Sequence, residues 1–325
     1  MRAKRLSSLV VGILMEASIN AATPFTLPDE NRVLQSSVEL EQKKEPWCPG
    51  DCSVGVPFVA SYRKGTERLV FVGAHHAFNP NAPTMRAVME GFAEIQPKVV
   101  ILEGFPTAMG ENPPPLVAGA RRYGAPDADE YGRGEGMYAA STALMRGIPF
   151  LGGEPTREEQ MQVLKAKGFT DADVAFGYLA GGLSQALRSQ DIPDTSVASL
   201  EKFYPRAAQN LKLPMDHGGW ALDAPSLEEF RQRYRQLYGV DIVGDKGFPL
   251  RIDVTLDKTR NGEQARFDMK TRDRHLLGLI EQQLTERHSV LVVFGGSHWA
   301  TLSTALEERL GKPKVRPFPG NFERN

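Results

Sequence analysis

The sequence predicts an α/β protein built on a central, mostly parallel sheet with a helical insertion. Short, continuously apolar runs end in a glycine followed by a polar residue, and such runs are typical of strands buried on both faces of a parallel sheet. Segments with apolar residues at helical spacing separate these runs. A third stretch, about residues 155–240, shows helical patterns and no strand. The length of 325 residues suits one large α/β domain or two small ones.

The first residues have the layout of a secretory signal peptide. Residues 1–22 begin with basic residues, continue through the apolar run Leu9–Met15 and reach small residues near Ala21 and Ala22. This layout predicts export to the periplasm or the medium, and an unprocessed cytosolic tail is the alternative.

A polar arm is expected over residues 23–55, without sustained periodicity. Its two cysteines, Cys48 and Cys52, are the only ones in the chain and flank a Pro-Gly turn. In an exported protein they would favour a disulfide that closes a small loop, whereas in the cytosol they would be reduced thiols.

The α/β domain is expected over residues 56–325 and opens with a β-α-β unit. Residues 57–74 alternate and then become continuously apolar, which predicts a hairpin that leads into a buried strand. A helix over 83–95, with proline near its first turn, and a strand over 97–104 follow. Parallel strands are expected on either side of that helix.

The middle of the domain begins with a long Gly- and Pro-rich loop over residues 105–135, which by its length is expected to be functional or mobile. A helix over 137–147 and a strand over 148–154 follow it. In the helical insertion, Thr156 with Glu159 and Ser226 with Glu229 have the spacing of capping boxes.

The C-terminal part returns to the α/β pattern. Its expected elements are an amphipathic helix over 271–284, a buried strand from 289, a helix over 299–313 and a last strand over 314–318.

Polar residues follow four of the strands. The segments "VFVGAHH", "PFLGGEPT" and "VVFGGSHW" share the order strand, glycine, polar residue, helix, and "VVILEG" adds a carboxylate. Because ligands bind outside the carboxyl ends of parallel strands, His76, Glu103, Glu154 and His298 are expected to converge there.

Two histidines and two carboxylates could hold a divalent metal such as zinc, manganese, cobalt or iron, with one position open for water. They could also act without metal, with one imidazole as the general base. Each also has a structural interpretation: a histidine as a hydrogen-bonded residue, Glu103 as an acceptor for turn amides, and Glu154 as a favourable charge at a helix start.

The paired G-x-x-H motifs, Gly73 to His76 and Gly295 to His298, together with "VVILEG", resemble the TraB/PrgY/Tiki family. More remotely they resemble the erythromycin-esterase and ChaN-like proteins, which implies a sheet of the EreA/ChaN-like type. The likeness covers short motifs within residues 65–320. His76, His298 and Glu103 match the family's motif residues.

The family's arginine motif resembles "TRDRHLL", with Arg272 in the arginine place and Asp273 where asparagine is more usual. Two rivals stay open at this point. His75 precedes His76 directly, and Arg274 lies two residues beyond Arg272. Arg272 could also be a solvated residue of a first helical turn, although a guanidinium is well suited to stabilising an oxyanion.

The resemblance implies a hydrolase of the TraB/Tiki type, and metal-dependent peptidase activity is the form it suggests. Its substrate would be a peptide or a small ester. A metal-free hydrolase of the erythromycin-esterase type is the nearest alternative. A non-catalytic protein that binds haem or a peptide, with the histidines as ligand contacts, is the alternative from another class.

Several other functions lack their sequence features. The formal net charge of -1 gives no basic field for nucleic acid, and no apolar run is long enough to cross a bilayer. No serine elbow, P-loop or dinucleotide fingerprint follows a strand. Asp216 and His217 are expected in a loop turn, and His275 and His288 are expected to be structural.

Overall fold

The computed structural model describes residues 57–77, 79–125, 134–188, 191–213, 219–254 and 256–318. Several expectations fall outside these residues: the signal peptide over 1–22, the polar arm over 23–55 with Cys48 and Cys52, and the turn with Asp216 and His217.

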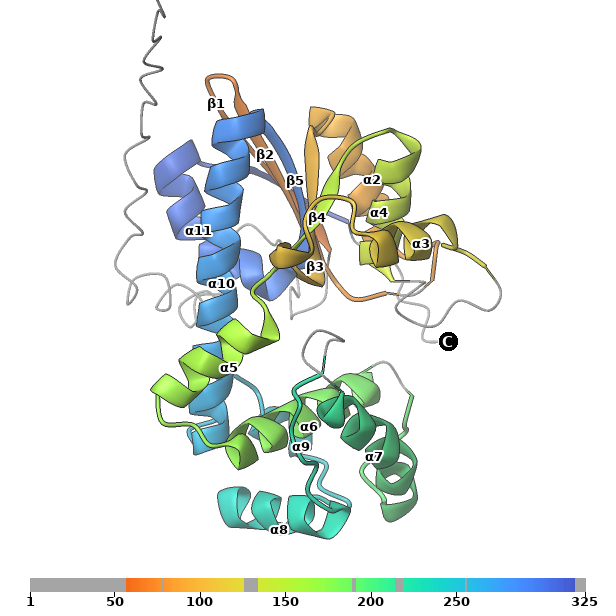
Figure 1. Ribbon diagram of the computed structural model, residues 1–325, viewed down its shortest axis with the longest axis vertical. Helices are drawn as coiled ribbons and strands as arrows, with labels where there is room; N and C mark the ends of the chain where they lie inside the picture. Colours follow the sequence, from red (N-terminus) through yellow and green to blue (C-terminus); the bar gives the residue numbers. More distant parts are fainter. Residues whose placement is uncertain are drawn as a thin grey trace, which may run out of the picture.

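A six-stranded mixed sheet forms the centre of the fold, with the order β4-β3-β5-β2-β1-β6 (Figure 1). The strands are β1 (Phe58–Lys64), β2 (Glu67–Ala74), β3 (Val99–Pro106), β4 (Phe150–Glu154), β5 (Ser289–Gly295) and β6 (Lys314–Pro317). β4, β3, β5 and β2 run parallel, while β1 pairs antiparallel with both β2 and β6. The α/β class and the mostly parallel sheet are therefore confirmed at this coarse level.

The predicted β-α-β unit has its strands parallel but not adjacent. β2 and β3 each pair with β5, which lies between them. The last of the four parallel strands in the sequence thereby separates the first two. This insertion places the end of β5 between the ends of β2 and β3, where His76 and Glu103 lie.

Helices cover both faces of the sheet. One face carries α2 (Pro83–Ile95), α3 (Pro114–Arg121) and α4 (Glu135–Met145), and the other carries α10 (Arg260–Arg287) and α11 (Gly296–Leu310) (Figure 1). The alternation of side chains along the strands fills both layers. In β5, Val290, Val292 and Phe294 face the α10 side, and Leu291 and Val293 face the α2 side.

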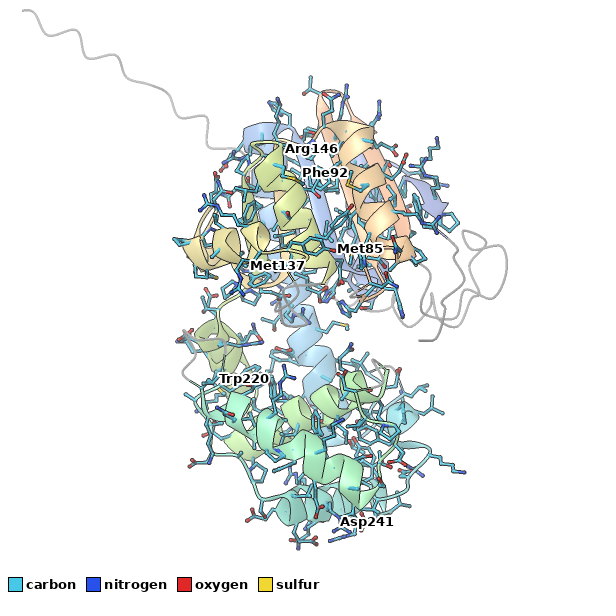
Figure 2. All side chains as sticks on the ribbon, turned by 90° about the vertical axis from the view of Figure 1, so that its right-hand side faces the viewer. Met85, Phe92, Met137, Arg146, Trp220 and Asp241 are labelled. Carbon is cyan, nitrogen blue, oxygen red and sulfur yellow. The ribbon has the colours of Figure 1, made fainter. Side chains whose placement is uncertain are left out.

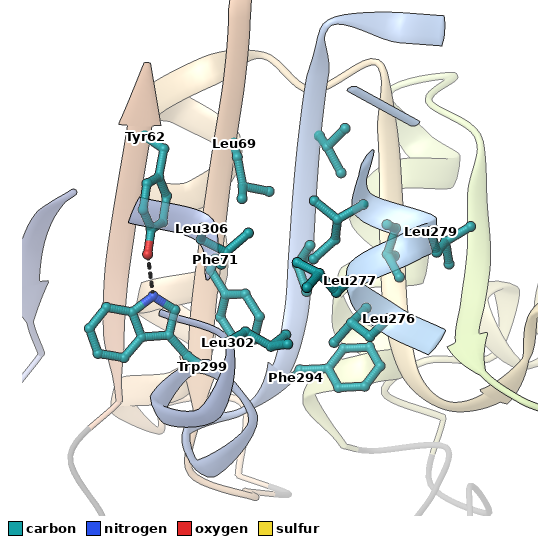
Figure 3. Packing of buried hydrophobic residues seen from close by; sticks show 14 of the residues in the cluster. Tyr62, Leu69, Phe71, Leu276, Leu277, Leu279, Phe294, Trp299, Leu302 and Leu306 are labelled. Carbon is teal, nitrogen blue, oxygen red and sulfur yellow. Dashed lines mark hydrogen bonds between the residues drawn. The ribbon is translucent and has the colours of Figure 1, made fainter. Parts of the chain in front are cut away.

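Tyr62 and Trp299 meet in the apolar layer between the sheet and the helices α10 and α11 (Figure 3). Both side chains are buried, and the Trp299 indole Nε1 donates a hydrogen bond of 2.9 Å to the Tyr62 hydroxyl. Burial raises the pKa of the Tyr62 hydroxyl far above its ordinary value. The bond therefore satisfies two polar atoms that would otherwise be buried without a partner.

A helical lobe lies beside the carboxyl ends of the strands (Figures 1 and 2). It contains α5 (Arg157–Ala166), α6 (Asp171–Arg188), α7 (Val197–Lys212), α8 (Leu227–Tyr238) and α9 (Phe248–Arg251). Its apolar core is separate from those of the sheet and includes Phe248 and, at its edge, Phe267 of α10. The lobe thus extends past residue 240 into the first half of α10, which spans both parts of the molecule.

The element boundaries confirm some of the predictions from the sequence and correct others. Both capping boxes, Thr156 with Glu159 and Ser226 with Glu229, are confirmed. The expected loop over 105–135 is wrong in part, because residues 114–121 form α3 with a proline in its first turn. Three helices also begin earlier than expected: α4 at Glu135, α10 at Arg260 and α11 at Gly296. No helix within the described ranges is long and apolar enough to cross a membrane.

Gly152 lies where β3 and β4 approach each other closely beside the candidate site, and its substitution tests this close approach. A Cβ at this residue would overlap the backbone carbonyl of Phe105. We expect Gly152→Ala to lower the free energy of unfolding by about 1–3 kcal/mol, the usual cost of overpacking. Urea unfolding followed by circular dichroism measures this change.

Gly181→Ala is the matched control. Gly181 is exposed in the interior of α6, and a Cβ there would meet nothing within 4 Å. This variant should be neutral or more stable by up to about 1 kcal/mol, since alanine is the better helix former. Equal stabilities for the two variants would contradict the close approach of the strands.

Candidate active site

The four predicted residues come together at one edge of the sheet. His76 follows β2, Glu103 lies in β3, Glu154 ends β4, and His298 lies in the first turn of α11 after β5. A Cβ built on Gly295 would lie 3.4 Å from Glu103 Oε2, 3.8 Å from His298 Cδ2 and 3.9 Å from His76 Nε2. His76, Glu103 and His298 therefore lie together as expected, and Glu154 is joined to Glu103 by the Arg272 guanidinium.

Two glycines beside the strand ends leave space for a neighbouring aromatic ring. A Cβ on Gly73 would overlap the ring of Phe58, its cross-strand partner, and one on Gly296 would lie 3.2 Å from the same ring. The Phe58 ring in turn packs edge-on against Trp299, with 5.0 Å between the centroids. Gly73 of the first motif and Gly296, which follows the second motif's Gly295, thus make room for one aromatic side chain beneath the site.

The Arg272 guanidinium joins two of the strand-end carboxylates. Its Nε donates to Glu154 Oε2 at 2.7 Å, and its Nη2 donates to Glu154 Oε1 at 2.5 Å and to Glu103 Oε1 at 3.0 Å. Backbone amides complete the set, since Gly104 N donates to Glu154 at 3.3 Å and Gly295 N donates to Glu103 at 2.6 Å. Nη1 of Arg272 makes no hydrogen bond with the described residues.

His298 is buried between two carboxylates. Its Nδ1 lies 2.5 Å from Asp273 Oδ1, and its Nε2 lies 3.3 Å from Glu103 Oε1. Burial and the nearby Arg272 charge would lower the pKa of this imidazole, but Asp273 and Glu103 outweigh them and raise it to about 10. At neutral pH His298 is therefore an imidazolium with both N–H groups donated, and it cannot accept a proton.

Glu103, Glu154 and Arg272 are also charged, because each lies against groups of opposite charge. Burial alone would raise the pKa of Glu103, but His298 and Arg272 bring it well below its ordinary value. Burial likewise opposes the charge of Glu154, and Arg272 lowers the pKa of that carboxyl. Burial would lower the pKa of Arg272, whereas Glu154 and Glu103 hold it well above the ordinary value. The centre of the site is thus a closed network of opposite charges.

His76 has a different environment from its counterpart in the second motif. Its side chain is 46% exposed, and its Nδ1 lies 2.6 Å from Glu135 Oε1. The backbone amide of Ala77 donates to the other oxygen of Glu135 at 3.2 Å. Glu135 is largely buried and begins α4, so it holds the ring from a fixed helix end. The Nε2 atom lies 3.9 Å from the position that a Cβ on Gly295 would take.

Glu135 is a site residue that the sequence analysis missed. It follows a glycine-rich stretch and opens a helix, where an acidic residue is ordinary, so no local pattern singles it out. Asp273 was noted only as a departure from the arginine motif, and the structure places it against His298.

The two sequence ambiguities are resolved by position. Arg272 lies in the network, whereas Arg274 is exposed on α10. The His76 ring reaches Glu135, while His75 is exposed and its carbonyl accepts a hydrogen bond of 2.6 Å from Thr84 Oγ1. His76 and Arg272 are therefore the candidates at these positions.

His275 and His288 have structural contacts, as expected. His275 Nε2 lies 2.8 Å from Thr107 Oγ1, and that hydroxyl donates to the Gly152 carbonyl at 2.8 Å. Burial lowers the pKa of His275, which favours the neutral ring. His288 ends α10 with a positive φ of 63°, and its carbonyl accepts from Arg68 N at 2.8 Å.

The predicted divalent metal does not fit these side chains as they lie. The Arg272 cation already contacts Glu103 and Glu154, and both nitrogens of His298 are directed at carboxylates. Within the described part of the chain, no three His, Cys, Asp or Glu side chains are grouped as metal ligands. Zinc, manganese, cobalt or iron binding by His76, Glu103, Glu154 and His298 stays a prediction.

The chain matches no family model, no curated protein and no solved structure with significance. The resemblance to the TraB/PrgY/Tiki family, and with it the EreA/ChaN-like sheet type, therefore stays a prediction from the short motifs.

The protonation of His298 gives a pH prediction. Since the folded-state pKa is raised from 6.5 to about 10, the stability that its charge contributes is full below pH 6.5 and lost as the pH rises through 10. Long-range ¹H–¹⁵N NMR of the imidazoles should show His298 still cationic at about pH 8–9, because its pKa lies above that window. The neutral ring of His275 serves as an internal reference.

Asp273→Asn is the variant for this experiment. Loss of the carboxylate charge should lower the pKa of His298 and shift the fall in stability to lower pH. A His298 ring that titrates near 6.5 in the parent protein would contradict the charged network.

Proposed function

We propose that this protein is a metal-free hydrolase of esters or amides in which His76 is the general base. The observation that carries the proposal is the position of the His76 ring. Nδ1 is held by Glu135 at 2.6 Å, the side chain is half-exposed, and Nε2 faces the strand ends. A base that is oriented by a carboxylate and reachable by water has the arrangement that proton abstraction requires.

Glu135 would fix the tautomer of the base. A carboxylate accepts the proton on Nδ1, so the neutral ring presents an unprotonated Nε2 to a water molecule. The same carboxylate stabilises the imidazolium once that proton has been taken. In this step the water proton moves to Nε2, and the hydroxide oxygen bonds to the substrate carbonyl carbon.

The negative charge that develops on the carbonyl oxygen needs donors. Arg272 Nη1 is directed to none of the described residues, while its other nitrogens are fixed by Glu154 and Glu103. The first N–H groups of a helix also lack intrahelical partners, and α11 begins at Gly296 beside Gly295. Preorganised donors of this kind stabilise an oxyanion. Collapse of the intermediate then breaks the bond to the leaving group, which takes the proton from His76.

The proposal keeps the hydrolase class that the paired motifs imply and assigns unequal roles to their histidines. His298 is a fixed charge rather than a base, because its pKa of about 10 keeps it protonated at neutral pH. Metal-dependent peptidase activity would require Arg272 to leave both glutamates. Haem or peptide binding without turnover stays the alternative from another class.

Replacement of His76 tests the proposal. We expect His76→Asn to lower kcat for p-nitrophenyl acetate or acetyl-alanine p-nitroanilide by about 10²–10⁴-fold, the usual contribution of a general base. Release of p-nitrophenol or p-nitroaniline measures the rate. His75→Asn, a change at the adjacent exposed histidine, is the matched control and should retain the parent rate.

Two results would contradict the proposal. One is no hydrolysis of either probe by the parent protein, together with a Soret band on haem addition that is lost in His76→Asn. The other is equal activity of His76→Asn and the parent.

A further inference from the structure

The end of β4 with the start of α5 carries one pair of opposite charges, and the helix α10 carries another. Glu154 and Arg157 are three residues apart, and Asp268 and Arg272 are four apart on one face of α10. Glu154 and Arg272 form the ion pair described above. Arg157 and Asp268 lie further into the helical lobe. They form no ion pair, although the charge of each acts on the pKa of the other. We call these two residues the separated pair.

Asp268 accepts no hydrogen bond at its Oδ1 atom from the described residues. Its Oδ1 atom is fully buried without a partner, while the side chain as a whole retains partial exposure. Burial raises the pKa of this carboxyl even though Arg272 and Arg157 both act to lower it. A buried acceptor of this kind is costly unless something supplies a donor.

Arg157 is a cation without a carboxylate partner among the described residues. Its guanidinium lies 4.6 Å above the ring of Trp220, and its Nη1 donates to the amide oxygen of Gln160 at 2.8 Å. Stacking on an indole orients a guanidinium while leaving its in-plane N–H groups available. The cation therefore faces the junction of the two lobes in a fixed orientation.

Trp220 adds a second donor at the same place. Its Nε1 atom is buried and has no acceptor within the described ranges. Figure 2 shows Trp220 on the side of the helical lobe that faces the sheet. Trp220 Nε1 and Asp268 Oδ1 thus lack partners among the described residues, and the stacked Arg157 guanidinium accompanies them next to the proposed catalytic centre.

We propose that Arg157, Trp220 and Asp268 form a binding subsite for an uncharged secondary amide of the substrate. The amide oxygen accepts from the guanidinium and the indole N–H, and the amide N–H donates to Asp268. An amide carries both functions without a net charge, whereas a carboxylate would face Asp268 and an ammonium would face Arg157. The assignment of the amide to a substrate rests on the proposed hydrolase function.

The subsite lies about one helical turn from Arg272, or roughly 5–6 Å along α10. An extended chain advances about 3.3–3.6 Å per residue. The bound amide is therefore one or two residues away from the bond that is cleaved. This spacing selects substrates in which an amide accompanies the scissile ester or amide.

Binding of the blocked tripeptide acetyl-Ala-Ala-Ala-amide tests the subsite by isothermal titration calorimetry. The full chain carries His76→Asn so that the peptide survives the titration. Arg157→Gln and Asp268→Asn, each added to this background, should raise the Kd at least about tenfold, since each removes a partner of a buried amide. Arg146→Gln is the matched control, because Arg146 also stacks on an aromatic ring, 4.9 Å from the centroid of Phe92, on the far face of the sheet.

Three outcomes separate the subsite from the proposed function. Tripeptide binding that weakens in both variants, but not in Arg146→Gln, supports the subsite even if the parent protein hydrolyses no ester. Hydrolysis of p-nitrophenyl acetate by the parent, with no tripeptide binding or with unchanged Kd values, overturns the subsite and leaves the hydrolase. If Arg157→Gln does not fold, Arg157→Lys takes its place, since lysine retains the charge but lacks the planar N–H donors of the guanidinium. An unchanged Kd in that variant also overturns the subsite.

Discussion

The hydrogen bonds and ion pairs of the Arg272 guanidinium are the constraint on which the rest of the site depends. One planar group contacts Glu154 in two places and Glu103 in one, and so ties α10 to the ends of β3 and β4. Since α10 spans both the sheet and the helical lobe, this contact also relates the two parts of the molecule. Removal of one partner from a partly buried network leaves charges without compensation, which commonly costs about 3–5 kcal/mol.

The same network makes the two histidine motifs unequal. The motifs share their spacing and their strand-helix context, yet α11 begins two residues before His298, which is buried, whereas His76 follows β2 in an exposed segment without regular secondary structure. Glu103 and Asp273 then hold His298 as a cation, and Glu135 orients the half-exposed His76. Near-identical local sequences thus supply a fixed charge in one position and a candidate base in the other. The difference arises from the elements that pack against them.

Local sequence patterns predicted the strands, both capping boxes and the convergence of His76, Glu103, Glu154 and His298, because buried runs and strand ends are encoded within a few residues. The contacts that decide the chemistry are remote in sequence. Glu135 reaches His76 across 59 positions, and Arg272 reaches Glu154 across 118. Nothing near Glu135 distinguishes it from an ordinary helix start. The metal hypothesis followed from residue types alone, which do not reveal that a guanidinium occupies the space between the carboxylates.

The Arg272 cation balances the carboxylates at the strand ends, and we propose that no metal ion takes this place. Elemental analysis of the purified full chain, handled without chelators or a histidine tag and desalted after exposure to excess zinc or manganese, tests it most directly. A variant that lacks both His76 and His298 is measured in parallel. We expect no stoichiometric metal in either protein. One equivalent of metal in the parent, absent from the folded double variant, would contradict it.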